Sequence, residues 1–469
     1  MQNRQKQTSL ADRIPSKVWV ETVYVYFKDD AGNVSSVATD TINLYSAIST
    51  VPSQSGTLTY SGSAQSPSWS NYDSNKLTLG GTTSKTDAGT YTATFTPMTN
   101  YIWSDGSTTV KSVNWSIGKA AGSLTLSNSS VSLNVGATVN VTATRSGNGT
   151  VSATSNNTGV ATVSVSGTTI TITGKASGTA TVTVSVAAGT NHTAPNSKTI
   201  SVTVNALAGN YVLNTLKPSG LNTTPEGGLY RFQGTNDTVN NYICFGTSDK
   251  STCTGDVDKY MYRIIGIDSS GQLKLIKKEA LNTAYEWHTD DTNITWPSST
   301  LYKGLNGNYY LNNTTYVSSG WSDKIATTTW KYGDTSSDDY TAANMYSIEN
   351  GWSTATSSKI GLMYMHDYYY AYQSGGLNCS SSSGNNSTCK ISWLHLWDSG
   401  ASNTETELII SRYGYATYSS YYVWFVQSAG FVNKGTLSSA RLVRPVFFLT
   451  SDVSYVSGSG TQADPIIIQ

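Results

Sequence analysis

The stretch that decides the fold of the C-terminal part reads SRYGYATYSSYYVWFVQSAGFVNKGTLSSARLVRPVFFL, residues 411–449. Two apolar-alternating runs, Tyr421–Val426 and Phe431–Asn433, flank a Ser-Ala-Gly turn, which predicts a β-hairpin. A third run, Val443–Leu449, is apolar and β-branched or aromatic, as a buried strand is. Pro445 within it favours an edge strand or a bulge, because proline has no N–H to donate to a neighbouring strand.

The aromatic side chains around this hairpin form the candidate binding face. Tyrosine beside serine and glycine is the composition of antibody binding loops, where rigid amphipathic rings lie next to small adaptable residues. The alternative interpretation is an ordinary strand with alternating tyrosines. Alternation points Val423, Phe425 and Val432 into the core and part of the remaining set outward. The candidate ligand-binding residues are Tyr413, Tyr415, Tyr418, Tyr421, Trp424, Gln427, Phe431 and Asn433.

The length and composition of the chain limit which classes of protein it can belong to. A chain of 469 residues is too long for one core, so about two to four domains are expected. The 29 basic residues balance the 29 acidic ones, and no basic patch indicates a nucleic-acid partner. The abundance of Ser, Thr, Gly, Asn, Val and Tyr is typical of β-structure with polar outer faces. No apolar segment reaches 18 residues, so no membrane insertion is expected in this chain.

The four cysteines point to an oxidising environment. They allow three connectivities, and the short separations favour Cys244–Cys253 and Cys379–Cys389. Neither pair has the two-to-four-residue gap of a zinc knuckle, and no histidine pair accompanies them. Residues 1–19 contain no apolar core of a signal peptide. We therefore expect that the chain is either a fragment of a longer extracellular protein or a protein that leaves the cell by another route, such as in a virion.

Two segments near the N-terminus predict small β-modules. Residues 18–46 contain two strand-like runs around KDDAGNVS, and resemble the last two strands of a bacterial Ig-like or fibronectin-like module, so 1–46 is interpreted as a truncated module. Residues 50–118 contain strand-like runs with turn residues between them, and DAGTY at Asp87–Tyr91 resembles the tyrosine corner of Ig-like folds. This segment resembles a bacterial Ig-like domain.

The tryptophans of residues 50–118 are Trp69, Trp103 and Trp115. They are interpreted as packing residues, with sugar stacking as the alternative.

Residues 119–205 predict a sandwich that acts as a spacer. Strand-like runs surround a turn at Gly136, and GKASGTATVTV at 174–184 opens a further alternating run. The segment resembles a group 2 bacterial Ig-like domain, as in intimin-type adhesins. From Gly118 to Ala206 there is no Asp or Glu, which excludes a carboxylate-based acid/base pair or calcium site there.

Residues 206–469 differ in composition, with 24 of the 31 tyrosines, 8 of the 12 tryptophans and all four cysteines. A hairpin is predicted from YRIIGI at 262–267 and LKLI at 273–276, and KIGLM at 359–363 is a candidate buried strand. Leu301–Leu311 predicts a short helix with Leu301 and Leu305 inward. Strand-like runs at the two ends of the segment are expected to bring its termini together.

These motifs, with the V-x-x-x-G-x-V hairpin at 426–432 and the R-P-V run at 444–446, carry a resemblance. The segment resembles C-terminal domains on surface proteins of gut Firmicutes, which are similar to the C-type-lectin-like fold of formylglycine-generating enzymes and to receptor-binding proteins diversified by retroelements. The resemblance implies that the hairpin before the R-P-V strand carries the variable binding residues. The expected fold class is tandem all-β Ig-like sandwiches followed by a loop-rich mixed α+β C-type-lectin-like domain.

Catalytic motifs are scarce. The sequence lacks the E-P-N, Q-P-D and W-N-D motifs of calcium-dependent lectins, and no H-E-x-x-H, G-x-S-x-G or phosphate-loop motif occurs. No cysteine pair near the C-terminal strands matches the copper ligands of formylglycine-generating enzymes. His366-Asp367 is a candidate catalytic dyad, but a core or rim histidine is favoured. Arg444, in a buried strand, is expected to hold a carboxylate or loop carbonyls.

The sequence therefore predicts an extracellular, adhesin-like binding protein at the cell surface or secreted. Ig-like modules form its stalk and a lectin-like head binds a host or bacterial surface glycan or protein. No catalysis, cofactor or metal is expected. A phage receptor-binding or tail protein is one alternative, and a carbohydrate-active enzyme is the other.

Overall fold

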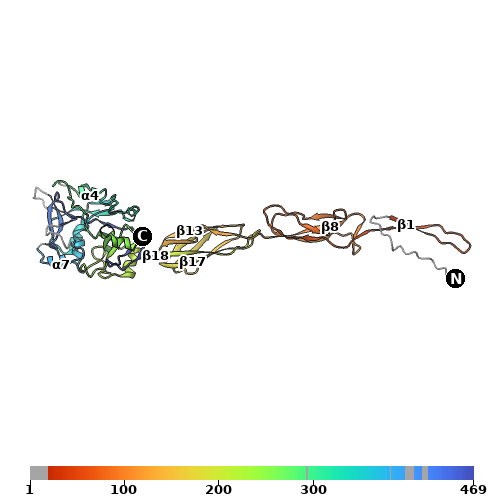
Figure 1. Ribbon diagram of the computed structural model, residues 1–469, viewed down its shortest axis with the longest axis horizontal. Coiled ribbons are helices and arrows are strands. Elements are labelled where there is room, and N and C mark those ends of the chain that lie inside the picture. Colours follow the sequence, from red (N-terminus) through yellow and green to blue (C-terminus); the bar gives the residue numbers. More distant parts are fainter. Residues whose placement is uncertain (1–19, 292–293, 381, 397–405, 415–420) are drawn as a thin grey trace.

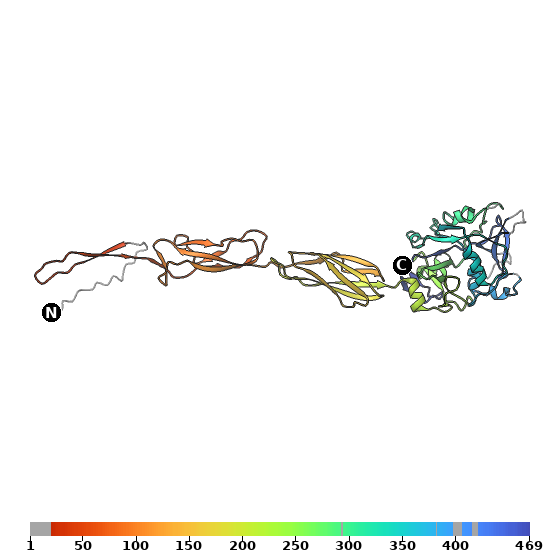
Figure 2. The same cartoon turned by 180° about the vertical axis from the view of Figure 1, so that it is seen from behind.

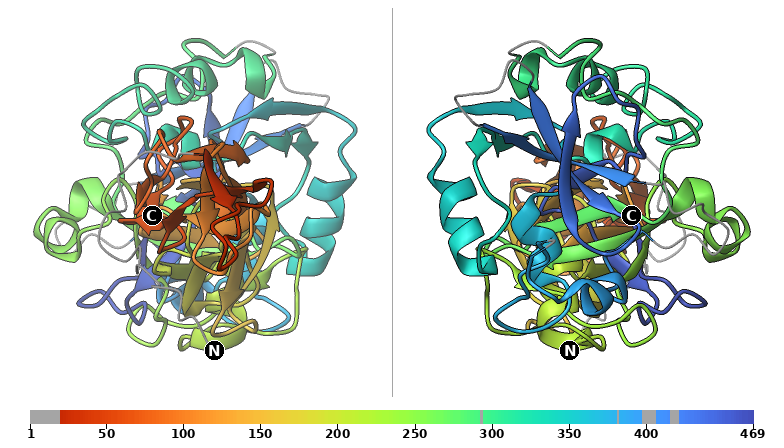
Figure 3. Two further views of the ribbon diagram at one scale, coloured as in Figure 1. Left: turned by 90° about the vertical axis from the view of Figure 1, so that its right-hand side faces the viewer. Right: turned by 90° about the vertical axis from the view of Figure 1, so that its left-hand side faces the viewer.

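The computed structural model describes residues 20–291, 294–380, 382–396, 406–414 and 421–469. The chain forms a rod with a wider end: a hairpin, two β-modules and a large C-terminal head follow one another along the long axis (Figures 1 and 2). In the views along that axis, the narrow part falls within the outline of the head (Figure 3). We call residues 46–205 the stalk and residues 206–469 the head.

The predicted N-terminal hairpin is confirmed. Its strands are β1 (Val20–Val25) and β2 (Ala38–Asn43), paired antiparallel. Asp29 closes a turn between them by accepting hydrogen bonds from the backbone and side-chain nitrogens of Asn33. Tyr24, Tyr26 and Phe27 are 60% or more exposed, so these aromatic rings have no core to enter.

The first stalk module packs small sheets around one aromatic core. A four-stranded sheet has the order β5-β10-β8-β7, and the pairs β4–β6 and β3–β9 pack with it. Trp103 and Trp115 are 1% exposed and Trp69 packs edge-on against Phe95, so these tryptophans are packing residues, as interpreted. The strands are β3 (Ser46–Ile48), β4 (Ser53–Ser55), β5 (Leu58–Thr59), β6 (Ser68–Ser70), β7 (Leu77–Gly81), β8 (Gly89–Pro97), β9 (Tyr101–Trp103) and β10 (Lys111–Gly118).

The tyrosine-corner motif of this module has the predicted geometry. The Tyr91 hydroxyl donates to the backbone carbonyl of Asp87 at 2.6 Å. The bond ties the start of β8 to the turn before it, which is the role of a tyrosine corner.

The second stalk module is a two-sheet sandwich. The sheets have the orders β11-β13-β16-β15 and β12-β18-β17-β14. Alternate Val, Ile and Ala side chains from both sheets fill the space between them, while most Thr and Ser side chains between these positions face outward. The strands are β11 (Leu124–Leu126), β12 (Ser130–Asn134), β13 (Thr138–Arg145), β14 (Val151–Ser155), β15 (Ala161–Ser166), β16 (Thr169–Gly174), β17 (Gly178–Val186) and β18 (Lys198–Asn205).

Side chains bridge the joint between the two stalk modules. The Asn191 side chain donates to the carboxylate of Asp87 and accepts from the backbone N–H of Ala88, both at 2.8 Å. The rings of Tyr60 and His192 meet edge-on with centroids 5.4 Å apart. These contacts restrict bending between the modules.

The joint between stalk and head uses the end of the chain. Asn134 at the end of β12 donates to the Asp452 carbonyl and accepts from the Ser454 hydroxyl, each at 2.5 Å. Leu207 forms a β-bridge with Ser454. The two ends of the head therefore lie together at the stalk, as the sequence predicted.

The head contains a five-stranded sheet whose main path is β19-β21-β22-β29, with β20 also paired to β21. Its centre is the predicted YRIIGI hairpin, which is confirmed. β29 (Val446–Phe448) lies at the edge of that path, the position that Pro445 predicted. The prediction of a strand at 359–363 was wrong. Ile360, Leu362 and Met363 are buried, but a single bridge from Gly361 to Val446 joins the segment to the sheet.

A second head sheet has the order β24-β26-β27-β28. Its hairpin is the one predicted from residues 421–433, with β27 and β28 antiparallel around Gly430 at φ 92°. The predicted short helix forms as α4, with Leu301 and Leu305 fully buried.

The remaining elements are short pieces between the sheets. The head strands are β19 (Tyr230–Arg231), β20 (Tyr242–Cys244), β21 (Met261–Ile267), β22 (Leu273–Lys277), β23 (Thr328–Lys331), β24 (Asp334–Thr335), β25 (Ala355–Ser358), β26 (Thr406–Tyr413), β27 (Tyr422–Gln427), β28 (Val432–Thr436), β30 (Tyr455–Ser457) and β31 (Ile467–Ile468). The helices are α1 (Ala208–Tyr211), η1 (Val212–Leu216), α2 (Lys250–Gly255), α3 (Val257–Tyr260), η2 (Trp296–Ser298), α4 (Thr300–Leu305), η3 (Ser322–Lys324), α5 (Ala342–Gly351), α6 (Met365–Tyr370) and α7 (Asn386–Lys390).

Both predicted disulfides are present. Cys244 bonds to Cys253 and Cys379 bonds to Cys389, with Cα–Cα distances of 5.9 and 6.0 Å. Each bridge fastens a loop to the core of the head, because all four cysteines are 2% exposed or less.

Candidate functional site

The second head sheet lies at the end of the head that is farthest from the stalk. Figures 1 and 2 show its strands on the opposite side of the head from the point where the chain enters. Gly430 donates to the Gln427 carbonyl at 2.9 Å and closes the turn between β27 and β28. The sheet therefore lies on the side of the head that faces away from the stalk.

Two residues of the predicted binding face are buried, which corrects the prediction that these two side chains contact a ligand. Tyr413 is 7% exposed and Trp424 is 3% exposed. Their rings meet edge-on at 5.2 Å, and the Trp424 indole donates to the Thr335 carbonyl at 3.4 Å. Strict alternation assumes that one face of the sheet is solvated, but residues 423–426 are all buried, so both faces of β27 are covered.

Four predicted binding residues remain partly exposed: Tyr421, Gln427, Phe431 and Asn433. They do not form one patch. Gln427 and Phe431 flank the hairpin turn, whereas Tyr421 precedes the other end of β27, about 20 Å away along a six-residue strand. Tyr415 and Tyr418 lie outside the described residues.

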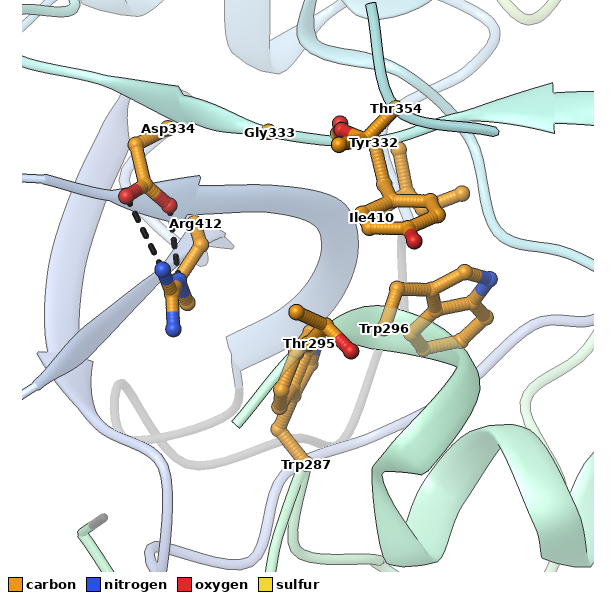
Figure 4. Close-up of a pocket in the computed structure, with 9 residues that line it drawn as sticks. All are labelled: Trp287, Thr295, Trp296, Tyr332, Gly333, Asp334, Thr354, Ile410 and Arg412. Carbon is orange, nitrogen blue, oxygen red and sulfur yellow. Dashed lines mark hydrogen bonds and ion pairs between the residues drawn. The ribbon is translucent and has the colours of Figure 1, made fainter. Parts of the chain in front are cut away.

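A pocket that the sequence did not predict lies beside the Tyr421 end of this sheet. Its volume is about 200 Å³. Figure 4 shows the ion pair of Asp334 and Arg412 on one side and the rings of Tyr332 and Trp296 on the other. We call it the indole pocket, and its lining residues are Trp287, Thr295, Trp296, Tyr332, Gly333, Asp334, Thr354, Ile410 and Arg412.

Arg412 and Asp334 give the pocket a neutral polar wall. Strands β24 and β26 run parallel with these two residues in register, so their side chains meet. The guanidinium binds the carboxylate through two hydrogen bonds of 2.7 and 2.9 Å, and it also donates to the Ile294 carbonyl at 2.8 Å. Its central carbon lies 5.5 Å from the centre of the Tyr421 ring, which places a predicted binding residue next to the pocket.

The two indoles of the pocket are buried and lack hydrogen-bond partners. Trp287 and Trp296 are each 1% exposed, with ring centroids 5.7 Å apart and planes at 46°. Neither indole N–H has a partner among the described residues. A buried unpaired donor costs about 1–3 kcal/mol, so this is an unusual arrangement. The sequence signal was available as two tryptophans in the polar run EWHTDDTNITWP, where no strand pattern accounts for them.

A second cavity, of about 240 Å³, lies beside a buried charge cluster in the head. Asp367 pairs with Lys274 at 2.6 Å and with Arg231 at 2.9 Å, and all three side chains are 3% exposed or less. Burial works to raise the pKa of Asp367, but Lys274, His366 and Arg231 outweigh it and hold the pKa well below its usual range. Burial lowers the pKa of Lys274.

His366 is a core histidine within this cluster. Its Nδ1 lies 2.6 Å from the Glu349 carboxylate, and its Nε2 lies 3.5 Å from Asp367. Glu349 also accepts hydrogen bonds from the backbone N–H groups of Met365 and His366 and from the Ser411 hydroxyl, so it caps the first turn of α6. The candidate dyad of His366 and Asp367 is therefore built into ion pairs and a helix cap.

Arg444 has the kind of partners expected from the sequence. Its guanidinium binds both carboxylate oxygens of Glu407 at 2.8 Å and donates to the Leu394 carbonyl at 2.6 Å. Both charged side chains are 3% exposed or less.

In the described residues, no group of three or more His, Cys, Asp or Glu side chains is placed to hold a metal ion. No described helix is long and apolar enough to span a bilayer.

Comparison with known proteins gives remote structural likenesses. No family model and no curated protein matches the chain. Domains 4 and 5 of the S-layer protein SbsC match 30% of this chain and 82% of theirs, at 21% identity and a TM-score of 0.17. The D00–D0 domain of intimin matches 32% of this chain and 99% of its own, at 15% identity and a TM-score of 0.15. This chain spans 31% of SbsC domains 1–6, at 15% identity and a TM-score of 0.17. At these TM-scores the likenesses identify no family.

Proposed function

We propose that this chain is an extracellular surface-binding protein in which a β-module stalk presents the far end of the head to a ligand. The observation that carries the proposal is the position of the second head sheet, with its partly exposed aromatic and amide side chains, at the end opposite the stalk. A binding surface held at the tip of a rod reaches a partner before any other part of the molecule.

The stalk supports this role by its construction. Asn191 bridges its two modules by donating to Asp87 and accepting from the Ala88 N–H, and Asn134 joins it to the head. The outer faces of its second module carry mainly hydroxyl groups, and the module contains no carboxylate. Such a surface suits a spacer. The two disulfides favour an oxidising, extracellular location.

The partner that we propose is a glycan or protein on a host or bacterial surface. The head is proposed to be C-type-lectin-like, in line with its paired chain ends and with the hairpin before the R-P-V strand. We propose binding without turnover, because Asp367 and Glu349, the carboxylates of the buried cluster, already hold ion pairs and a helix cap.

An array of surface glycans and proteins, probed with the full chain, tests this function. We expect saturable binding that Tyr421→Ala and Asn433→Ala each weaken. Tyr24→Ala is the matched control, because Tyr24 is a 62% exposed tyrosine in the N-terminal hairpin, at the other end of the rod. A hydrolysis assay on each bound glycan separates binding from turnover. Binding that follows Tyr24, or cleavage of a bound glycan, contradicts the proposal.

A further inference from the structure

We propose that the second cavity of the head binds a short extended peptide that carries a carboxylate, and that the peptide joins β23 as an added strand. The cavity has a volume of about 240 Å³ and lies beside the buried charge cluster. All four residues of β23 line it. No residue of the second head sheet lines it, so this inference goes beyond the proposed function and names a separate site.

Strand β23 has an open edge. Its neighbour in a two-stranded sheet is β25, and the described residues pair no further strand with it. In an antiparallel pair, residues that exchange hydrogen bonds alternate with residues whose N–H and C=O groups point the other way. Tyr332 donates to the Thr354 carbonyl at 3.1 Å, which sets this alternation. The backbone groups of Thr329 and Lys331 therefore point away from β25.

Three backbone groups on this edge lack a partner among the described residues. They are the N–H and C=O of Thr329 and the N–H of Lys331, whereas the Lys331 carbonyl accepts from the Tyr364 hydroxyl at 2.8 Å. Thr329 is exposed and Lys331 is half-buried, so this part of the strand meets solvent. An extended chain supplies carbonyl and N–H groups at strand spacing, and one of its residues opposite Thr329 can satisfy both Thr329 groups.

The shape of the cavity suits a main chain. Its volume lies below the range of sites for drug-sized ligands. Gly227 and Gly228 line it without side chains, at φ values of 56° and 78°, where a side chain is disfavoured. A Cβ atom on Gly228 would come within 3.1 Å of the Tyr346 hydroxyl. An extended chain rises about 3.3 Å per residue, so about three peptide residues cover the edge from Thr329 to Lys331.

The charges at the cavity favour a ligand with a carboxylate. The charged side chains of the lining are three cations and one carboxylate: Arg231, Lys274, Lys331 and Glu349. Asp367 pairs with two of these cations from outside the lining, so the five charges sum to one positive charge. His366 also lines the cavity, and its protonation can only add to this charge.

Lys331 is the cation that can reach a ligand. Arg231 and Lys274 are 3% exposed or less and already hold Asp367, whereas Lys331 is half-buried. The Lys331 ammonium donates to the Asn350 carbonyl. A carboxylate is a stronger hydrogen-bond partner for an ammonium group than a neutral carbonyl is. We therefore expect the peptide to place an acidic group beside Lys331.

An array of peptides probed with the full chain tests the site. Each peptide is an acetylated and amidated hexapeptide with Glu, Gln or Lys at its third position and Val, Ile, Thr, Tyr or Phe, which favour strands, elsewhere. We expect at least one Glu peptide to bind with a Kd below about 1 mM. Its Gln and Lys counterparts should bind at least about tenfold more weakly, because the charge-assisted bond to Lys331 is lost. The inference is overturned if no Glu peptide binds, or if the Lys counterparts bind equally well.

The peptide that binds best then tests the open edge. Thr329→Pro removes one edge N–H and leaves the hydrogen bonds to β25 in place, so it should weaken binding at least about threefold. Ser357→Pro is the matched control, because Ser357 is opposite Thr329 in β25 and directs its N–H to the other edge of the same sheet. Equal affinities of the two variants overturn the inference. Methylation of each peptide nitrogen in turn tests the same ladder on the unchanged chain, and at least one methyl group should abolish binding.

Two further measurements test the charge and the place of binding. Lys331→Gln should remove the preference for Glu over Gln, whereas Lys303→Gln, at an exposed lysine of α4, should keep it. Sodium acetate that displaces the peptide at an equal concentration would show a simple anion site and overturn the inference. Hydrogen exchange should slow at Thr329 and Lys331 when the peptide is bound. Slower exchange at the second head sheet instead would place the peptide elsewhere and also overturn it.

Discussion

Replacing Arg444 with alanine should strip a buried carboxylate of its counter-ion. Glu407 and Arg444 are joined by two hydrogen bonds of 2.8 Å, and the guanidinium also holds the Leu394 carbonyl. Glu407 belongs to β26 of the second head sheet, and Arg444 precedes β29 of the first. The pair therefore ties the two sheets together inside the head, where both side chains are buried.

The expected cost follows from burial. Removing one partner of a buried ion pair costs about 3–5 kcal/mol, because the other charge remains without compensation. That is a large part of the roughly 5–15 kcal/mol that stabilises an ordinary domain. Burial raises the pKa of Glu407 already in the native protein, against the opposing effect of Arg444. Without Arg444 the pKa must rise further, so the Glu407 side chain takes up a proton in the folded state.

This gives the variant a pH signature. A carboxyl whose pKa is higher in the folded than in the unfolded state contributes stability below its unfolded pKa and loses that stability as pH rises through the folded value. Arg444→Ala should therefore be more stable in mildly acidic than in neutral solution, because the raised pKa keeps Glu407 neutral on the acid side. Denaturant unfolding followed by tryptophan fluorescence measures both effects.

The double variant Arg444→Met with Glu407→Leu separates the effect of an unpaired buried charge on stability from the effect of lost side-chain packing. It replaces both ions with apolar groups of similar length and should recover most of the stability. If Arg444→Ala costs under about 1 kcal/mol, or if its stability is independent of pH between about 5 and 7.5, the Glu407 carboxylate does not depend on Arg444 and the reasoning is refuted.

Three further predictions concern other parts of the chain. Changing Cys379 and Cys389 together to serine should lower the free energy of unfolding of the head by roughly 2–3 kcal/mol. The melting temperature should be lower in this variant, and reductant should no longer act on it through this bridge. Asn191→Ala should loosen the joint between the stalk modules, because it removes two hydrogen bonds across that joint. Small-angle scattering should then show a changed maximum dimension or a broader distance distribution, and finding neither would contradict the prediction. Burial lowers the pKa of His395 to about 4, so stability should fall as pH drops from 6.5 to 4, and His395→Gln should flatten that slope.

Local patterns predicted the elements whose partners are near in sequence. The hairpin at 421–433 and the YRIIGI hairpin both form, because turn residues and period-two alternation act within about a dozen residues. The disulfides and the tyrosine corner also follow from short spacings. Each of these features is decided by a short stretch of chain.

Burial of whole elements depends on packing that local patterns do not contain. The run at 359–363 is apolar enough for a strand, but its backbone makes one bridge, and α6 follows at Met365. Trp424 alternates with core residues and is nevertheless buried, and its indole donates to the carbonyl of Thr335 in β24. Hydrophobic pattern indicates that a residue is apolar, and it does not indicate how many layers cover a sheet.

The indole pocket is the clearest case of a site made by distant segments. Its lining comes from the loop of Trp287 and Trp296, from residues 332–334, from Thr354 and from β26. Parallel pairing of β24 with β26 brings Asp334 to Arg412 across 78 positions in the chain, and no spacing rule links them. What the sequence does contain is two tryptophans in a polar run with no strand to join. A large aromatic side chain in such a run must bury itself against another segment, so its presence indicates a tertiary pocket or core contact before the partner segments are known.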